Sequence, residues 1–266
     1  MSSHESQAGV PSRARPAPAI SSIAALTALE LRLAARRGEN ILVTLVIPVA
    51  VLLFFGGSGV IALAANPVPS LVPGTIALGI VAAGLVNLGI ATAFERRYGV
   101  LKRLGAAPLP RGGFLAAKLT AVLVLEMVQL IVIVAAAKLA FGWSPGPAWS
   151  PIVVVVAVAL GTAAFASLGL LLAGTLRAEA VLALANALFL GLLMVGGVVL
   201  PVDHLPTFLQ GFATLLPSSA LADVLRIGLD SGTTATATDL AVALPVLAAW
   251  AIGAAVLAAR FFRWDD

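Results

Sequence analysis

A single carboxylate stands near the middle of a long apolar run. Glu126 lies within residues 114–141, and Gln129 follows it on the same helical face. A charged residue at the centre of a membrane costs at least about 2.5 kcal/mol to insert, so it is a functional-site candidate by default. The alternative is a structural group, protonated or hydrogen-bonded to a neighbouring helix, with Asn87 and Asn186 as candidate partners.

Residue types that carry other chemistry are missing or widely separated. The sequence has no cysteine, and its two histidines, His4 and His204, lie far apart, so we expect no metal site. It contains neither the G-x-x-x-x-G-K-[ST] nor the G-x-G-x-x-G pattern that cradles phosphates. We therefore expect no catalytic residues and no cofactor bound by this chain. Any nucleotide that it uses must be bound by a partner.

The elements that must position Glu126 and Gln129 are membrane spans. The 266 residues are 61% hydrophobic and 11% charged, against about 45–50% and about 25% for soluble domains. Six apolar runs are each long enough to cross a hydrocarbon core of about 30 Å. They cover residues 41–63, 71–94, 114–141, 151–174, 181–200 and 239–259. The sequence therefore predicts an all-α integral membrane protein with six transmembrane helices.

The distribution of basic residues predicts the orientation of these spans. Residues 1–20 are rich in Ser, Pro and Arg and predict a disordered tail, and the apolar spacing of residues 21–38 favours an interfacial helix. With the N-terminus inside, only Lys138 and Arg226 of the 16 Lys and Arg residues fall toward the other side. The positive-inside rule then places both termini in the cytoplasm. This distribution accounts for the net charge of +4 without any nucleic acid.

A short basic segment follows the second predicted span. Residues 94–105 predict an amphipathic helix that is joined directly to the span, has one apolar and one basic face, and stops at Gly105. A docking helix for a cytoplasmic partner and a solvated positive-inside loop both fit this pattern. The candidate contact residues are Glu95, Arg96, Arg97, Tyr98, Leu101, Arg103 and Leu104.

A second irregular segment separates the last two predicted spans. It contains an apolar helical stretch that is too short to span a membrane, followed by a proline that starts another short helix. Two half-helices in succession favour a re-entrant hairpin at the outer face. An ordinary outer loop with an interfacial helix fits equally well. The residues that define the segment are Pro201, Asp203, Pro206, Phe208, Phe212 and Pro217.

Three stretches, in this order and spacing, resemble the ABC transporter permeases of the transmembrane type-2 class. They are Ile-Pro-Val-Ala-Val-Leu-Leu-Phe-Phe-Gly at 47–56, Glu-Arg-Arg-Tyr-Gly-Val-Leu-Lys-Arg-Leu at 95–104, and the Leu-Pro pairs at 200–201, 205–206 and 216–217. The resemblance is closest to the bacterial drug- and antibiotic-export branch, the daunorubicin-type permeases. It departs at Tyr98, where family members often carry a small or polar residue.

The resemblance implies a transport subunit of an ATP-driven exporter in the bacterial inner membrane. Residues 21–266 would form the permease domain, which pairs with a second copy or a homologous permease. Two separate ATP-binding subunits would hold the ATP and Mg²⁺. Residues 95–105 would be the coupling helix that these subunits contact. A drug, lipid or other hydrophobic compound would pass between the two permeases, and the remaining contacts would be with membrane lipid.

Two other functions stay open on the sequence alone. A proton-coupled secondary transporter would use Glu126 as its relay, but one carboxylate is a thin relay and no internal repeat of the kind found in such transporters is visible. A membrane scaffold subunit without transport activity fits the same composition. Whether transport requires an ATPase subunit separates the three functions.

Overall fold

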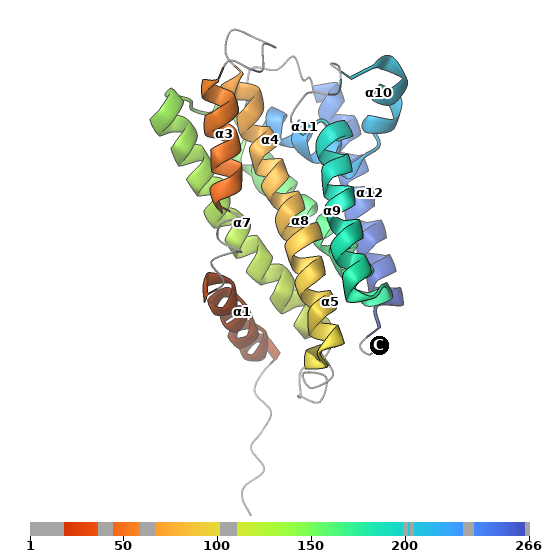
Figure 1. The fold of residues 1–266 in the computed structure, drawn as a ribbon. Helices are drawn as coiled ribbons and strands as arrows, with labels where there is room; N and C mark the ends of the chain where they lie inside the picture. The colour runs from red at the N-terminus through yellow and green to blue at the C-terminus, as the bar shows by residue number, and fades with distance from the viewer. Residues whose placement is uncertain are drawn as a thin grey trace, which may run out of the picture.

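The computed structural model is a bundle of helices (Figure 1). It describes residues 19–36, 45–58, 67–101, 111–198, 202, 205–230 and 237–263. All regular structure within these ranges is helical. Five of the described helices are long and apolar enough to cross a membrane, and a sixth span is obtained if the bent pair α10–α11 counts as one. At this level the predicted all-α membrane architecture is confirmed.

The long helices coincide with five of the six predicted spans. The uninterrupted ones are α7 Arg111–Phe141, α8 Pro151–Thr175, α9 Ala178–Val195 and α12 Ala237–Phe261. The remaining one has three consecutive segments, α4 Val68–Val81, the π-helix η2 Ala82–Leu88 and α5 Gly89–Arg97. We call this continuous stretch, Val68–Arg97, the central rod.

The shorter helices are α1 Ala19–Arg36, α3 Ile47–Gly57, α10 Thr207–Ala213 and α11 Pro217–Gly228. Helix α1 begins at Ala19, so the predicted tail of residues 1–20 is wrong at its last two positions, and residues 1–18 lie outside the described ranges. Of the predicted span 41–63, the described part contains the apolar α3, which is too short to cross by itself. The first span therefore stays a prediction.

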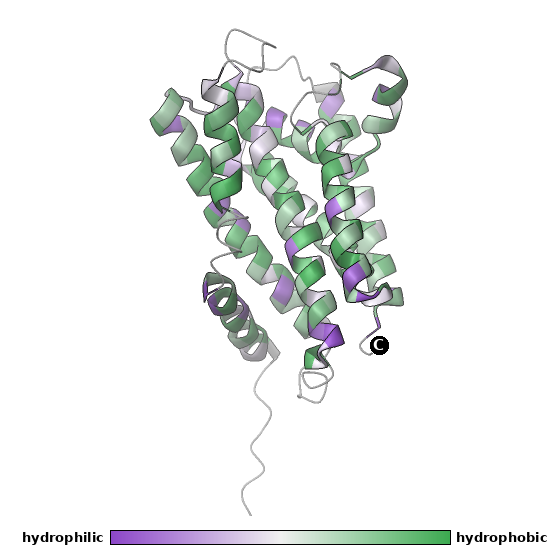
Figure 2. Cartoon of the chain, in the orientation of Figure 1, coloured by the Kyte–Doolittle hydropathy of each residue, from purple (hydrophilic) through white to green (hydrophobic). Residues whose placement is uncertain are grey.

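The central rod forms the interior of the bundle. Every position from Leu71 to Leu85 is buried, and the rod packs against α3, α7, α8, α9 and α11. A helix that is apolar on all sides is stable only when it is surrounded in this way or by lipid. In contrast, only a minority of positions in α7, α9 and α12 are buried. Their outward faces are apolar (Figure 2), as lipid or another apolar surface requires.

The central rod and α8 cross where glycines let the two backbones come close together. A Cβ atom on Gly84 would lie 2.7 Å from the Ala166 backbone nitrogen, and one on Gly89 would lie 3.0 Å from Gly169 Cα. Such close approach through small residues is how membrane helices gain packing contacts without a hydrophobic driving force. The glycines therefore fix the distance between the rod and α8.

Helices α5, α8 and α12 end, and α9 begins, at one end of the bundle (Figure 1). The Arg263 backbone nitrogen, just after α12, donates to Gly174 O near the end of α8 at 3.1 Å. The arginines that lie here are Arg96, Arg97, Arg177, Arg260 and Arg263. We call this the basic end.

We predict that a methyl group at the glycine crossing destabilises the bundle. A Cβ on Gly169 would approach Gly84 O and would lie 3.1 Å from Leu85 O, so Gly169→Ala should lower the free energy of unfolding by about 1–3 kcal/mol, the usual cost of overpacking. Gly191→Ala is the matched control, because a Cβ there meets nothing within 4 Å and alanine favours a helix by up to about 1 kcal/mol. Thermal unfolding in detergent measures both. Equal melting temperatures would contradict the backbone contact.

Candidate functional site

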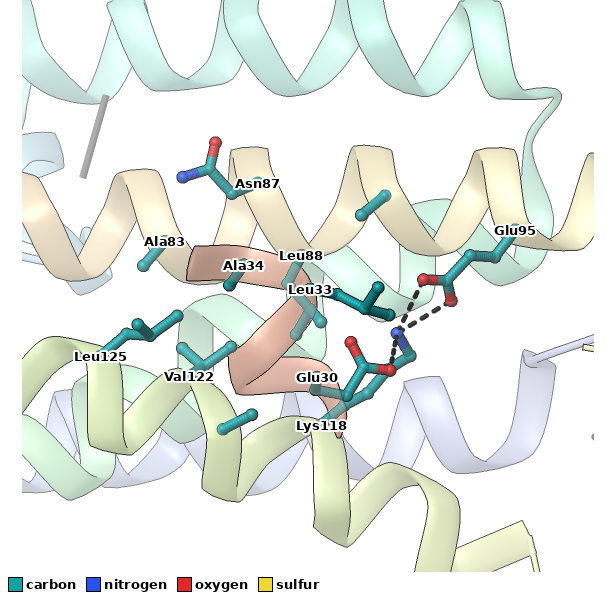
Figure 3. A pocket seen from close by; sticks show the side chains of 12 residues that line it. Glu30, Leu33, Ala34, Ala83, Asn87, Leu88, Glu95, Lys118, Val122 and Leu125 are labelled. Atoms are coloured by element: carbon teal, nitrogen blue, oxygen red, sulfur yellow. Dashed lines mark hydrogen bonds and ion pairs between the residues drawn. The ribbon is translucent and has the colours of Figure 1, made fainter. Parts of the chain in front are cut away.

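A buried lysine joins three helices at the basic end (Figure 3). Lys118 of α7 is 2% exposed, and its Nζ lies 2.9 Å from Glu30 Oε1 on α1 and 2.8 Å from Glu95 Oε2 on α5. The same Nζ lies 5.2 Å from the centroid of the Phe114 ring. An ammonium group removed from water requires such partners, since its desolvation is otherwise uncompensated. We call Lys118, Glu30 and Glu95 the lysine cluster.

The lysine cluster borders a small cavity of about 90 Å³. Apolar side chains such as Leu33, Leu88 and Val122 form much of its lining, and Asn87 lies at its edge, directed away from the charges (Figure 3). Pockets for drug-sized ligands measure about 300–1,000 Å³. The cavity is therefore too small for a drug-sized ligand. The lysine cluster ties α1, α5 and α7 together.

The end of α5 is fastened to the connection between α8 and α9. The Arg96 guanidinium donates to Leu176 O at 2.6 Å, and Arg97 forms an ion pair with Glu179 in the first turn of α9. Arg96 is buried. The expectation that Arg96 lies on a basic face open to a partner is therefore wrong, because its guanidinium satisfies a carbonyl of this chain.

The predicted unbroken helix over residues 94–105 is also wrong. Helix α5 ends at Arg97, and the next two residues form a turn in which Gly99 has a φ of 68°. Glycine adopts this left-handed conformation without the strain that a Cβ atom would add. Helical structure resumes at Val100. A glycine in a left-handed turn thus stands between the central rod and the segment that follows it.

The turn at Gly99 separates Tyr98 from Leu101, which an unbroken helix would place on one face. Tyr98 is 66% exposed and stacks on Phe94 with 6.1 Å between ring centroids, whereas Leu101 is fully buried. Leu101 therefore packs within this chain and offers no surface to a partner. Arg103 and Leu104 lie outside the described residues, so their predicted contacts stay predictions.

The mid-span carboxylate lies in a second polar group, formed by Glu126 and Gln129 of α7 with Thr162 of α8. All three residues are buried, and Glu126 Oε2 is hydrogen-bonded to Thr162 Oγ1. Thr162 Oγ1 also lies 2.7 Å from Val158 O. A hydroxyl carries one hydrogen, so both contacts form together when Thr162 donates to Val158 and a neutral Glu126 donates to Thr162. We call these three residues the polar core cluster.

Gln129 links the polar core cluster to the central rod. Its amide lies directly over Gly79 of α4, at the place that a side chain there would occupy. Neither amide atom of Gln129 has a hydrogen-bond partner among the described residues. Leaving a buried polar group unpaired costs about 1–3 kcal/mol. The contact therefore requires a glycine at position 79, and no hydrogen bond from the described residues stabilises it.

The sequence suggested Asn87 or Asn186 as the partner of Glu126. Asn186 is exposed on α9 and donates to Leu182 O of its own helix at 2.7 Å, so that suggestion is wrong. Asn87 lines the cavity beside the lysine cluster. The observed partner, Thr162, was missed because a threonine in a helix commonly bonds its own backbone, as Thr162 does to Val158.

The segment between the last two spans contains two helices that meet at 84°, α10 and α11. Phe208 and Phe212 of α10 are exposed, Pro206 directly precedes that helix and Pro217 begins α11. Helix α11 packs against α4, α8 and α12, and its buried Arg226 donates to Gly197 O at 2.5 Å. Two half-helices are thus present as predicted. Pro201 and Asp203 lie outside the described residues.

Comparison with known families adds a match that covers most of the chain. A family model described as ABC-2 type transporter matches residues 21–229. A search of curated proteins gives no match. The matched range contains the lysine cluster, the end of α5, the polar core cluster and the α10–α11 pair.

We predict that Lys118 is required for stability. Lys118→Met would leave two carboxylates facing each other, and breaking a buried ion pair costs about 3–5 kcal/mol. The lower end applies here, because Glu30 and Glu95 each keep about a fifth of their side-chain surface exposed. Lys138→Met on the exposed part of α7 is the control. Neutralising both carboxylates as well, with Glu30→Gln and Glu95→Gln, should restore most of the melting temperature in detergent. A silent Lys118→Met would contradict the cluster.

We predict that Glu126→Gln keeps the fold. A glutamine amide can donate to Thr162 as a neutral carboxyl does, so the free energy of unfolding should change by no more than about 1 kcal/mol. Glu126→Lys, which places a positive charge at the same buried position, should fail to accumulate in the membrane. Expression level and melting temperature measure both variants. Failure of Glu126→Gln to insert would identify Glu126 as an obligatory ion-pair partner.

Proposed function

The chain belongs to the ABC-2 type transporter family, a family of membrane subunits of ABC transporters, and we propose that it is the permease of an ATP-driven exporter for hydrophobic compounds. In this proposal two permeases, either two copies of this chain or this chain and a homologue, combine with two ATP-binding subunits. In this proposal the complex lies in the bacterial inner membrane. The cargo is a lipophilic drug, a lipid or a similar compound, which passes between the two permeases.

The charge distribution supports an orientation with the basic end in the cytoplasm. Lys and Arg residues are enriched in cytoplasmic segments of membrane proteins, and the arginines that end α5 and α12 and begin α9 all lie at the basic end. Both termini then lie in the cytoplasm. Helix α1, which packs on α7 beside the lysine cluster, lies at the cytoplasmic membrane surface. The α10–α11 pair forms a re-entrant hairpin at the outer face, and residues 41–63 provide the first of six spans.

One observation carries the proposal: the most buried of the long helices is tied to its neighbours by two ion pairs at the basic end. Within three positions of α5, Glu95 binds Lys118 and Arg97 binds Glu179. These two ion pairs link the central rod to α7 and α9, and Lys118 extends the link to α1 through Glu30. A force applied at the end of α5 is therefore shared by four elements instead of bending one helix.

The surface that receives this force lies directly beside these ion pairs. Tyr98 is exposed, and about half of the Arg97 side chain is also accessible. An aromatic ring with a neighbouring guanidinium is a combination enriched at the centres of protein interfaces. We propose that the ATP-binding subunit contacts Tyr98 and the segment that follows Gly99, including Arg103 and Leu104.

The experiment uses the full-length chain and its ATP-binding subunit in inside-out vesicles. Uptake of a lipophilic dye should require both the subunit and ATP hydrolysis, whereas the purified chain alone should bind no ATP. Uptake driven by a proton gradient without the subunit would instead support a secondary transporter. Uptake under neither condition, together with a stable complex, would support a scaffold subunit.

The same vesicles test the contact. Tyr98→Ala should weaken the ATP-binding subunit's affinity about tenfold or more, since burial of a large side chain contributes about 1.5–3 kcal/mol. Trp149→Ala is the matched control, because Trp149 is an exposed aromatic residue in the connection between α7 and α8, at the opposite end of the bundle. Co-purification and dye uptake per ATP hydrolysed are the measurements. Equal behaviour of the two variants would place the contact elsewhere.

A further inference from the structure

The ends of four helices surround a pocket at the basic end. Helices α5, α8, α9 and α12 border a space of about 450 Å³. Its charged lining consists of Arg96, Arg97, Arg177, Arg263 and Glu179. Four guanidinium groups therefore face a single carboxylate. We call this space the arginine pocket.

Two of the four guanidinium groups are already occupied by this chain. Arg96 donates to Leu176 O, and Arg97 pairs with Glu179. The side chains of Arg177 and Arg263 are exposed and form neither a hydrogen bond nor an ion pair within the described part of the chain. Among the described residues, the pocket consequently holds two cationic groups that have no counter-charge.

The start of α9 adds to this positive character. Arg177 is the residue before the first turn of α9, and no side chain caps that end. The first backbone N–H groups of a helix point outward and carry a partial positive charge. These N–H groups lie at the same pocket as the guanidinium groups of Arg177 and Arg263, because Ala178 also lines it.

We propose that the arginine pocket binds the phosphate headgroup of an anionic phospholipid. Guanidinium groups bind phosphate oxygens in bidentate geometry, with stronger hydrogen bonds than neutral donors form. Basic pockets between transmembrane helices are suited to anionic headgroups.

The surroundings of the pocket select a lipid over a free phosphate. Leu257 and Phe261 in the last turns of α12 are exposed, and so is Leu182 near the start of α9. Acyl chains attached to a headgroup in the pocket would cover these apolar side chains. A free phosphate would satisfy the arginines alone. The pocket lies where spans end, which is the depth of lipid headgroups.

The proposal needs only that the chain spans a membrane, so it stands or fails independently of the exporter function. The test titrates the purified, delipidated, full-length protein in a neutral detergent with dioleoylphosphatidylglycerol or with dioleoylphosphatidylcholine. Bound lipid is counted by native mass spectrometry, and the melting temperature is recorded in parallel. The wild type should bind the anionic lipid at least about tenfold more tightly than the zwitterionic one.

The variants localise that preference. Arg177→Gln with Arg263→Gln should reduce affinity for the anionic lipid by about 25-fold, at about fivefold for each arginine, and should reduce affinity for the zwitterionic lipid much less. Arg36→Gln with Arg260→Gln is the matched control, because it removes the same charge from exposed arginines that do not line the pocket. The control should keep the wild-type preference.

Four results would overturn the proposal. The first is a wild type that binds both lipids equally, a result that needs no variant and so does not depend on the variants folding. The second is an equal loss in the control pair. The third is inorganic phosphate that raises the melting temperature as much as the anionic lipid at the same concentration, which would identify a free-phosphate site. The fourth is an unchanged lipid preference in the pocket variants with loss of the ATP-binding subunit, which would identify a protein contact.

Discussion

Inside a membrane a polar group can be satisfied only by the protein itself, because the hydrocarbon offers no hydrogen-bond partners. The described bundle meets this constraint at a few points, each of which joins separate helices. Lys118 draws α1 and α5 onto α7, Arg226 ties α11 to Gly197 just beyond the end of α9, and Glu126 bonds Thr162 across α7 and α8. Apolar packing then fills the space between these points. The arrangement of the helices is thus set by where their few polar side chains can meet.

Two kinds of contact hold the central rod, and they differ in how much movement of the rod they tolerate. In its middle, Gly84 and Gly89 lie against the backbone of α8 with no room for a side chain between them, and such close packing tolerates little movement. At its end, Glu95 and Arg97 hold long side chains on α7 and α9, which tolerate small rotations without losing their charge partners. A rod with a rigid middle and a compliant, multiply connected end is suited to receive a push at that end and pass it to several helices.

Sequence reasoning predicted five of the long helices correctly, because twenty apolar residues in a row leave few alternatives. It failed where a residue type has two common uses. Lys118 was counted only as a positive charge on the cytoplasmic side. A lysine inside an apolar run needs an acidic partner, and Glu30 and Glu95 lie at the same end of the bundle. Leu101 fits an exposed apolar face on a helical wheel, but the turn at Gly99 rotates it into the interior. Thr162 carries no sequence signal at all, since its role depends on the facing helix.

The π-helical segment η2 sets the phase between the two halves of the central rod. Residues 82–88 wind more widely than an α-helix, and each residue added or removed in a helix turns everything beyond it by about 100°. Losing one residue from this segment would carry Glu95 and Arg97 around the rod axis and away from Lys118 and Glu179, even with every side chain unaltered. The number of residues in this stretch is therefore constrained, and deletions here should be far rarer among related chains than substitutions.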